Sequence, residues 1–355
     1  MNLLGIGTVF GRGRNVNVLR GALRDGWQAP VTPPVYTISD ETLADRTILR
    51  GTLRRADRFC RMAVLAAADA LADAHNASDP TATGLVIGTA FGPHVTTFRF
   101  EDEILTHGDS AVSPTIFAHS VHNVAAAYVG LACGVRGPLV SVTHFSLAFH
   151  HALLIARSWL EERRCSRVLV GGVDELGVVA RYIWGMRRRL AVDGRLCPFA
   201  AAADAVAAPG EGACFLLLAR DQPSPRSYGR IRSVGVGAPP SAWPTDTTRL
   251  VLDADGTNGD ETGYLALDGI RRLPVSAFTP LWGSLPSAGS SFSLAAVATM
   301  AADNRIWPVP VADNPHGMDL STQGQFTNAT IVKIGCHGMS GWIDFEKSEL
   351  ESRKT

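Results

Sequence analysis

The sequence has little charge. Only 19% of its 355 residues are Asp, Glu, Lys or Arg, whereas soluble domains usually contain about 25%. The 33 basic and 33 acidic side chains give a formal net charge of zero, so the chain lacks the positive field with which proteins attract polyanions. We therefore expect no nucleic-acid partner. A chain of this length has room for one large domain or for two fused halves.

Long stretches contain no charged residue, yet none of them has the composition of a membrane span. Residues 137–156 include His144, His150 and His151, and residues 273–302 include three prolines and six serines. Membrane-spanning helices are instead dominated by Leu, Ile, Val and Phe. A signal peptide is not indicated either, because arginines interrupt the start of the chain. We expect a cytoplasmic protein, not embedded in a membrane, in which these stretches are buried.

The sequence also lacks the motifs of disulfide, metal and dinucleotide sites. Its six cysteines are scattered without a CxxC pair, and its ten histidines form no HExxH. Gly5, Gly7 and Gly11 do not have the GxGxxG spacing of a dinucleotide-binding loop. We expect reduced, mostly buried thiols, no metal and no cofactor.

Periodicity predicts alternating strands and helices in the first part of the chain. Short apolar runs bounded by glycine predict buried strands, and longer Ala- and Leu-rich segments predict helices. The predicted strands are residues 84–89, 139–142, 167–172 and 213–219, and the predicted helices are residues 56–74 and 149–162. Alternation of this kind is typical of an α/β fold.

A second series of elements follows a polar connector at residues 222–227. We therefore predict two halves, residues 1–221 and residues 228–355. Helical segments 149–156 and 292–302 have no charged face, so they must be covered on all sides and are expected to lie between two sheets. The predicted elements of the second series are strands at 231–236, 249–252, 329–335 and 341–345 and the helix at 292–302.

The segment that ends at Ser146 resembles a known family. Residues 137–146, GPLVSVTHFS, are similar to the nucleophile strand and elbow of β-ketoacyl synthases, which belong to the thiolase superfamily. The resemblance implies a thiolase-like five-layer αβαβα fold with two pseudo-equivalent halves, and an obligate dimer. Other similar segments, in the family's order, are VIGTAFG at 86–92, VSP at 112–114, VGG at 170–172, PF at 198–199, GEGA at 210–213 and GCHG at 335–338.

The resemblance also identifies what this chain has replaced. The family uses a cysteine nucleophile at a helix N-terminus, which stabilises the thiolate, and two histidines that assist decarboxylation and stabilise the enolate. Ser146 occupies the cysteine position, Asp255 the first histidine position and Ser290 the second, while Leu285 replaces a family lysine. Serine cannot form the reactive thiolate that a cysteine provides. A carboxylate at Asp255 would repel a developing enolate. We interpret the active site as dismantled.

Two residues of the GCHG segment determine whether some catalytic activity could remain in this chain. Cys336 takes the place of a family phenylalanine whose backbone N–H completes the oxyanion hole, and a backbone donor does not depend on the side chain. His337 is a candidate replacement base under the family fold, and its alternative interpretation is a turn residue.

A protein with this fold but without the catalytic residues resembles a chain-length factor, the inactive half of the ketosynthase heterodimer in type II polyketide synthases. The resemblance implies two partners, an active ketosynthase and an acyl carrier protein that carries the growing polyketide or polyene chain. It also implies that this subunit shapes the acyl tunnel. An internal helix is the alternative for residues 114–128. The residues expected to line the tunnel or the subunit interface are Thr115, Ile116, Phe117, His119, Val121 and Phe145.

Alternative functions remain open from the sequence. Ser146 is a candidate nucleophile for a serine-dependent acyltransferase or hydrolase. His150 and His151 are its neighbours, but adjacent residues of a helix point about 100° apart, so at most one of them faces Ser146. A structural scaffold without a tunnel is the third alternative. The arginines at 163–164 and 187–189 either receive the acidic carrier protein or form a solvated helix face.

Overall fold

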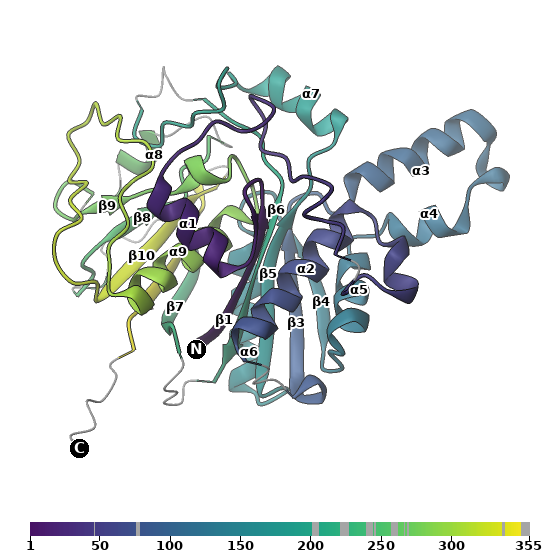
Figure 1. Cartoon of the computed structure of the whole chain (residues 1–355), viewed down its shortest axis with the longest axis horizontal. Coiled ribbons are helices and arrows are strands. Elements are labelled where there is room, and N and C mark those ends of the chain that lie inside the picture. The colour runs from purple at the N-terminus through teal and green to yellow at the C-terminus, as the bar shows by residue number, and fades with distance from the viewer. Residues whose placement is uncertain are drawn as a thin grey trace.

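The structure is a computed structural model of the whole chain (Figure 1). It describes residues 1–45, 47–75, 79–200, 206–220, 227–238, 244, 246–256, 262–265, 267, 270–335 and 338–348. The predicted connector at residues 222–227 lies outside these ranges except for its last residue. Residues 257–261, Cys336 and His337 also lie outside them.

The first half of the chain contributes five long strands to the sheet. They are β1 (Asn2–Phe10), β3 (Thr83–Thr89), β4 (Leu139–Thr143), β5 (Arg167–Asp174) and β6 (Gly212–Ala219). Their order is β4-β3-β5-β6-β1, in which β3, β4 and β5 are parallel and β6 is antiparallel to both neighbours. The four predicted strands of this half are confirmed. The sequence pattern does not predict β1, because Gly5 and Gly7 interrupt its apolar residues where helix α2 (Arg58–Asp73) packs directly on the strand.

The second half repeats this arrangement. Its strands are β7 (Gly229–Gly237), β8 (Leu250–Leu252), β9 (Val275–Ser276), β10 (Asn328–Ile334) and β11 (Ser340–Glu346). They are ordered β9-β8-β10-β11-β7, with β8, β9 and β10 parallel and β11 antiparallel to both neighbours. When the five strands named in each half are counted in chain order, the third is outermost in the sheet. The second, fourth, fifth and first follow it inward. This shared order confirms two pseudo-equivalent halves.

The two halves are hydrogen-bonded into one sheet through their first strands. Asn2 and Leu3 of β1 pair with Arg230 and Gly229 of β7. A short strand, β2 (Gly13–Arg14), forms a hairpin with the end of β1.

Two helices form the layer between the halves, as the sequence predicts. Helix α6 (Ala148–Glu161) contacts β3 and β5 of the first half and β7 and β11 of the second, and α9 (Gly289–Asp303) contacts β5, β6, β10 and β11. Phe149 of α6 and Phe292 of α9 belong to one apolar cluster that also includes strand residues of both halves. The absence of charge in residues 149–156 of α6 and 292–302 of α9 is explained by this central position, because a layer between the two halves of the sheet has no solvated face.

The outer faces of the two halves are covered differently. In the first half, α2 (Arg58–Asp73) packs over β1, β5 and β6, and α5 (Val124–Cys133) packs over β3 and β4. Leu85 and Ile87 of β3 belong to the apolar cluster beneath these helices. In the second half, the described residues over β8 and β10 belong to the short helix α8 (Thr262–Leu265) and to loops that supply Leu267 and Met318. The outer layer of the second half is therefore thin within the described ranges.

Four further helices lie at the edges of these layers. They are α1 (Val16–Asp25), α3 (His94–His107), α4 (Pro114–His119) and α7 (Val178–Arg187). Helices α3 and α4 project from the body as an arm beside α5 (Figure 1). Short 3-10 turns within the described ranges are Gly51–Arg55, Pro80–Ala82, Asp109–Ala111 and Thr279–Leu281.

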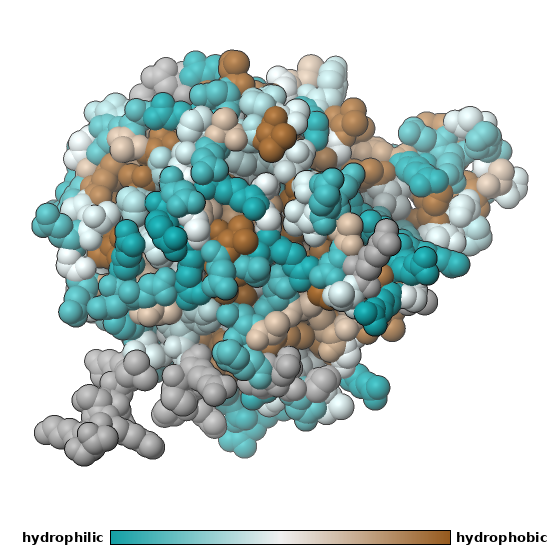
Figure 2. All heavy atoms as spheres, in the orientation of Figure 1, coloured by the Kyte–Doolittle hydropathy of each residue, from teal (hydrophilic) through white to brown (hydrophobic). Residues whose placement is uncertain are grey.

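The surface combines a largely hydrophilic body with apolar side chains on the arm (Figure 2). Neither α4 nor α7 has a buried residue, so both present their apolar side chains to solvent in the isolated chain. No helix within the described ranges is long and apolar enough to cross a lipid bilayer.

Candidate functional site

The elbow between β4 and α6 holds Ser146, which is 1% exposed. The Nδ1 atom of His144 accepts hydrogen bonds from the backbone N–H groups of Ser146, at 3.3 Å, and Leu147, at 3.1 Å. His144 therefore fixes the elbow before α6, whose N-cap residue, Leu147, makes no side-chain capping bond. The helix start also lies against Gly88 of β3, where a Cβ would come within 2.8 Å of the backbone of Ala148. Only glycine leaves α6 this close to the sheet.

The helical histidines that follow Ser146 are used for packing. His150 is fully buried, and within the described chain neither of its ring nitrogens has a hydrogen-bond partner. Its ring lies against Gly341 of β11, and burial, with the charge of Lys333 adding to it, lowers its pKa to about 3. The ring of His151 packs 5.2 Å from the ring of His144, centre to centre. His150 is thus turned into the core and not toward the Ser146 hydroxyl.

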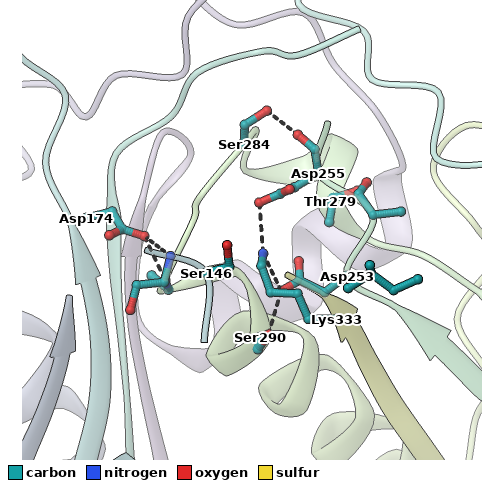
Figure 3. A network of polar contacts seen from close by, with 12 residues as sticks. Ser146, Asp174, Asp253, Asp255, Thr279, Ser284, Ser290 and Lys333 are labelled. Carbon is teal, nitrogen blue, oxygen red and sulfur yellow. Dashed lines mark hydrogen bonds and ion pairs between the residues drawn. The ribbon is translucent and has the colours of Figure 1, made fainter. Parts of the chain in front are cut away.

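Asp255 and Ser290, which the sequence resemblance assigns to the family's histidine positions, belong to one buried cluster around Lys333. The ammonium Nζ lies 2.9 Å from Asp255 Oδ2 and 3.0 Å from Asp253 Oδ2. The Ser290 hydroxyl donates to the same Asp253 oxygen at 2.6 Å (Figure 3). None of these four residues is more than 3% exposed. We call Asp253, Asp255, Ser290 and Lys333 the lysine cluster.

The topology of the second half explains how the lysine cluster forms. Strands β8 and β10 are parallel neighbours, and Leu252 is opposite Val332. The next residue on each strand, Asp253 and Lys333, therefore lies at the same carboxyl edge. Asp255 follows Asp253 by two residues, the spacing that returns an extended chain to the same side.

Buried hydrogen bonds fix the loop that carries the two aspartates. The Tyr264 hydroxyl donates to the Asp253 carbonyl at 2.8 Å, and the Thr279 hydroxyl donates to the Ala254 carbonyl at 2.7 Å. The Ser284 hydroxyl donates to the Asp255 carbonyl. The loop is therefore held to α8 and to the segment before α9, which keeps both carboxylates on Lys333.

The charges of the lysine cluster are stabilised by direct contact with one another, because the cluster is buried away from solvent. Burial opposes the charge of Lys333, but the two carboxylates outweigh it and raise the pKa of the ammonium. Burial raises the pKa of Asp253 to about 6, the charge of Asp255 adds to this effect, and Lys333 and Ser290 oppose it. Lys333 therefore stays protonated at neutral pH with its charge directed at two acids.

Asp174, at the end of β5, connects the first half to the start of α9. Its carboxylate accepts hydrogen bonds from the backbone N–H groups of Ser287 and Ala288, both at 2.7 Å, and of Ala90, at 3.2 Å. Burial raises its pKa, and these three donors counteract the effect. A carboxylate at a helix N-terminus is also favoured by the helix dipole. Asp174 thus fixes the position of α9 relative to β3 and β5.

The elbow of the first half lies against the end of β10 in the second. A Cβ on Gly335 would lie 3.3 Å from the Leu147 side chain. Leu147 follows Ser146, and Gly335 follows Lys333 by two residues on the same face of the chain. Ser146 and the lysine cluster therefore occupy one region between the halves, as the resemblance implies, and Figure 3 shows them in a single view.

A second group of buried titratable side chains lies at the ends of β3 and β5. Glu175 is 6% exposed and accepts a hydrogen bond from the Val95 N–H at 3.3 Å. The Nδ1 atom of His94 lies 4.0 Å from the Glu175 carboxylate. Burial raises the pKa of Glu175 to about 8, and the nearby Asp57 carboxylate adds to the effect. Burial also lowers the pKa of His94.

The sequence gives only a weak signal for this second group. Glu175 lies three residues beyond the strand predicted at 167–172, and no family motif or residue spacing connects it with His94, which is far away in the chain. Only the pairing of β3 with β5 brings their carboxyl ends together.

The residues predicted to line a tunnel or an interface lie on the surface of the isolated chain. Phe117 packs 5.6 Å from the ring of Phe100 on α3, and Phe145 packs 5.4 Å from the ring of Phe91. The His119 ring is hydrogen-bonded to the Tyr128 hydroxyl at 2.9 Å. Exposed residues of this set are Thr115, Phe117, Val121 and Phe145, and half-buried ones are Ile116 and His119.

The part of the chain that the structure describes contains neither a disulfide nor a metal-binding group of side chains. Five thiols are free there, of which those of Cys60, Cys165 and Cys214 are buried. The described ranges contain no group of three His, Cys, Asp or Glu side chains that could hold a metal ion.

Residues 21–224 match the family model described as "Beta-ketoacyl synthase, N-terminal domain". Nodulation protein E of Rhizobium meliloti is 28% identical over 245 residues, which cover 64% of this chain and 60% of that protein. Nodulation protein E of Rhizobium leguminosarum bv. trifolii is 26% identical over 299 residues, which cover 75% of this chain and 72% of that protein. The match to the first two relatives covers only 60% of their length.

Solved structures share the fold over nearly the whole chain. "The ishigamide ketosynthase/chain length factor" has a TM-score of 0.81 at 15% identity, with 98% of each chain covered. A β-ketoacyl synthase from Burkholderia phymatum has a TM-score of 0.77 at 17% identity, with 98% of this chain and 99% of that chain covered. A type II polyketide synthase ketosynthase in complex with its acyl carrier protein has a TM-score of 0.75 at 15% identity, with 98% and 99% covered. The predicted thiolase-like fold is confirmed.

Proposed function

The chain belongs to the β-ketoacyl synthase family, and from this premise we propose that it is a non-catalytic subunit of the chain-length-factor type. The lysine cluster is the observation that carries the proposal. Asp255, assigned by resemblance to the first family histidine, holds a buried ion pair with Lys333, and Ser290, assigned to the second, donates to Asp253. These polar groups are directed at one another, so they do not act as donors to a developing enolate.

The edge of the sheet supports an obligate partner. Strand β4 is outermost in the strand order, and in the described chain it pairs only with β3. Unpaired edges are normally covered or charged, yet the residues of β4 are all uncharged. Exposed apolar residues near this edge include Phe117, Val121 and Leu131. An active ketosynthase that covers the β4 edge and the arm would bury these groups, as obligate interfaces do.

Helix α7 supports the proposed encounter with an acyl carrier protein. It has no buried residue, and it displays Tyr182 and Met186, 68% and 69% exposed, beside Arg181 and Arg187. Exposed cations around apolar anchors suit an acidic protein with an apolar helix face. The arginines at 163–164 are less suitable, because they lie at the far end of α6 and Arg164 is paired with Glu162.

In this proposal the subunit sets chain length through the bulk of side chains in the arm and elbow. Phe117, with Phe100 behind it, and Phe145, with Phe91 behind it, are rigid apolar pairs. Rings that support one another resist displacement by an acyl chain better than single exposed side chains do.

Replacing Ser146 with Ala in a complex reconstituted with an active ketosynthase and carrier protein tests the proposal. We expect product formation within about twofold of the wild-type complex. Loss of turnover while the complex still assembles, judged by size-exclusion chromatography, would reject the proposal and favour the serine-dependent acyltransferase. An acyl adduct on Ser146, sought by mass spectrometry after incubation with acyl thioesters, would do the same.

A further inference from the structure

An arginine-lined pocket lies far from the site described above. Its volume is about 370 Å³, and its cationic walls come from α6, from the end of β6 and from β7. The four arginines that line it are Arg157, Arg220, Arg230 and Arg232. Arg157 lies eleven residues beyond Ser146, which corresponds to about 16 Å along a helix. The arginine pocket, as we call it, is therefore separate from the Ser146 elbow.

Three of the arginines have carboxylate partners. Arg157 is paired with Glu161 at 2.7 Å on the same helix, and Arg230 is paired with Glu346 on the neighbouring strand. Arg232 is paired with Asp246 and lies 3.4 Å from Glu346. Each of these pairs is partly exposed, and the guanidinium groups of Arg157 and Arg232 have more donors than their carboxylates use.

Arg220 is different. No carboxylate in the described ranges forms an ion pair with it, and its buried Nε has no hydrogen-bond partner there. A buried donor without an acceptor is costly, and such groups in native proteins commonly mark a bound ion or ligand. The lining of the arginine pocket therefore contains four guanidinium groups and one carboxylate, that of Glu161, and within the described ranges Arg220 has no ion-pair partner.

We propose that the arginine pocket binds the phosphate group of a small phosphorylated molecule. Guanidinium groups bind phosphate through two parallel hydrogen bonds, and several of them converging from different elements suit a dianion better than a single carboxylate. Leu160, Ile231 and Val234 add apolar wall to the pocket. Its volume exceeds that of a phosphate ion alone, so an organic part of the ligand can lie on this apolar wall.

Calorimetric titration tests the arginine pocket with inorganic phosphate, pyrophosphate and adenosine monophosphate as separate probes, at constant ionic strength. We expect saturable binding of the phosphorylated probes, and tighter binding of the nucleotide than of free phosphate if the apolar wall contributes. Arg220→Gln should weaken binding at least about tenfold, the effect of losing one charged hydrogen bond. Arg157→Gln, which changes an exposed side chain and leaves the fold intact, should weaken it several-fold.

Arg99→Gln is the matched control, because Arg99 also pairs with a glutamate one helical turn away but lies on the arm. Its binding should equal that of the wild-type chain. No saturable binding of any probe at millimolar concentration, or equal binding by Arg220→Gln, Arg157→Gln and wild type, would overturn the proposal. Tight binding of free phosphate with no gain for the nucleotide would restrict the ligand to the inorganic ion.

Discussion

The ammonium of Lys333 lies 2.9 Å from the carboxylate of Asp255, in the interior of the protein and without solvent contact. Asp255 is the residue that the sequence resemblance assigns to a catalytic histidine position of the family, and its charge holds a lysine of the neighbouring strand. Removing one partner of such a pair is far more harmful than replacing both, because an isolated charge remains buried.

Lys333→Met should lower the free energy of unfolding by about 3–5 kcal/mol, because it leaves two buried carboxylates without a cation. Equilibrium unfolding in urea measures the change. Lys347→Met is the control, since Lys347 makes an exposed contact with Asn304 and should lose much less stability. Combining Lys333→Met with Asp253→Asn and Asp255→Asn should restore more than half of the loss. A triple variant as unstable as the single one would show that the ion pairs are not the cause.

Glu175→Gln should make the protein more stable at alkaline pH. The pKa of the folded-state carboxyl is raised to about 8, mainly by burial, so the folded chain binds the proton more tightly than the unfolded chain does. Wild-type stability should therefore fall as pH rises from about 4.5 to 8. The variant should gain roughly 2–4 kcal/mol at pH 9 and little at pH 4.

Unfolding in urea at several pH values measures this difference. Glu101→Gln, at an exposed position of α3, should leave the pH dependence unchanged. The same slope in Glu175→Gln and in wild type would contradict the assignment to Glu175.

Phe117→Ala should lengthen the main product of the reconstituted complex by at least one two-carbon unit, because it removes the ring that packs on Phe100. Phe117→Trp should shorten it. Mass spectrometry of the products measures both effects. Leu105→Ala changes another exposed apolar residue of the arm, 84% exposed, and should leave the product unchanged. Identical products from all variants would argue against a tunnel at Phe117.

Gly341→Ala should cost about 1–3 kcal/mol of stability, because the new methyl group would lie 2.5 Å from the His150 ring. His150→Ala should relieve that clash, so the two substitutions should couple by more than about 1 kcal/mol in a double-mutant cycle. If the two stability effects are strictly additive, the His150 ring does not face β11. The orientation of His150 relative to Ser146 would then differ from the one described above.

Much of the fold is predictable from the sequence because its strands are buried on both faces. Apolar runs such as residues 167–172 and 213–219 have no alternating pattern, and short runs of this kind favour strands between helical layers. The uncharged segments at 149–156 and 292–302 predict the central layer for a similar reason. Strand β1 escapes the pattern because Gly5 and Gly7 replace apolar side chains where α2 packs against the sheet.

The candidate site is only partly predictable. Ser146, Asp255 and Ser290 follow from the family resemblance, since each lies in a recognisable segment. Lys333 does not, because a single lysine in the apolar run 329–335 gives no indication of its partners. Its role depends on the parallel pairing of β8 with β10, which places it beside Asp253. The His94 and Glu175 group depends in the same way on the pairing of β3 with β5.

The apolar cluster between the two halves of the sheet belongs to neither half alone, because α6 and α9 each pack on strands of both and β1 pairs with β7. Loss of either half would expose the inner faces of the other. The chain should therefore unfold in a single cooperative transition, and fragments separated between β6 and β7 should not fold independently. The two halves repeat the same strand order, but because they share the helical layer they fold as one unit.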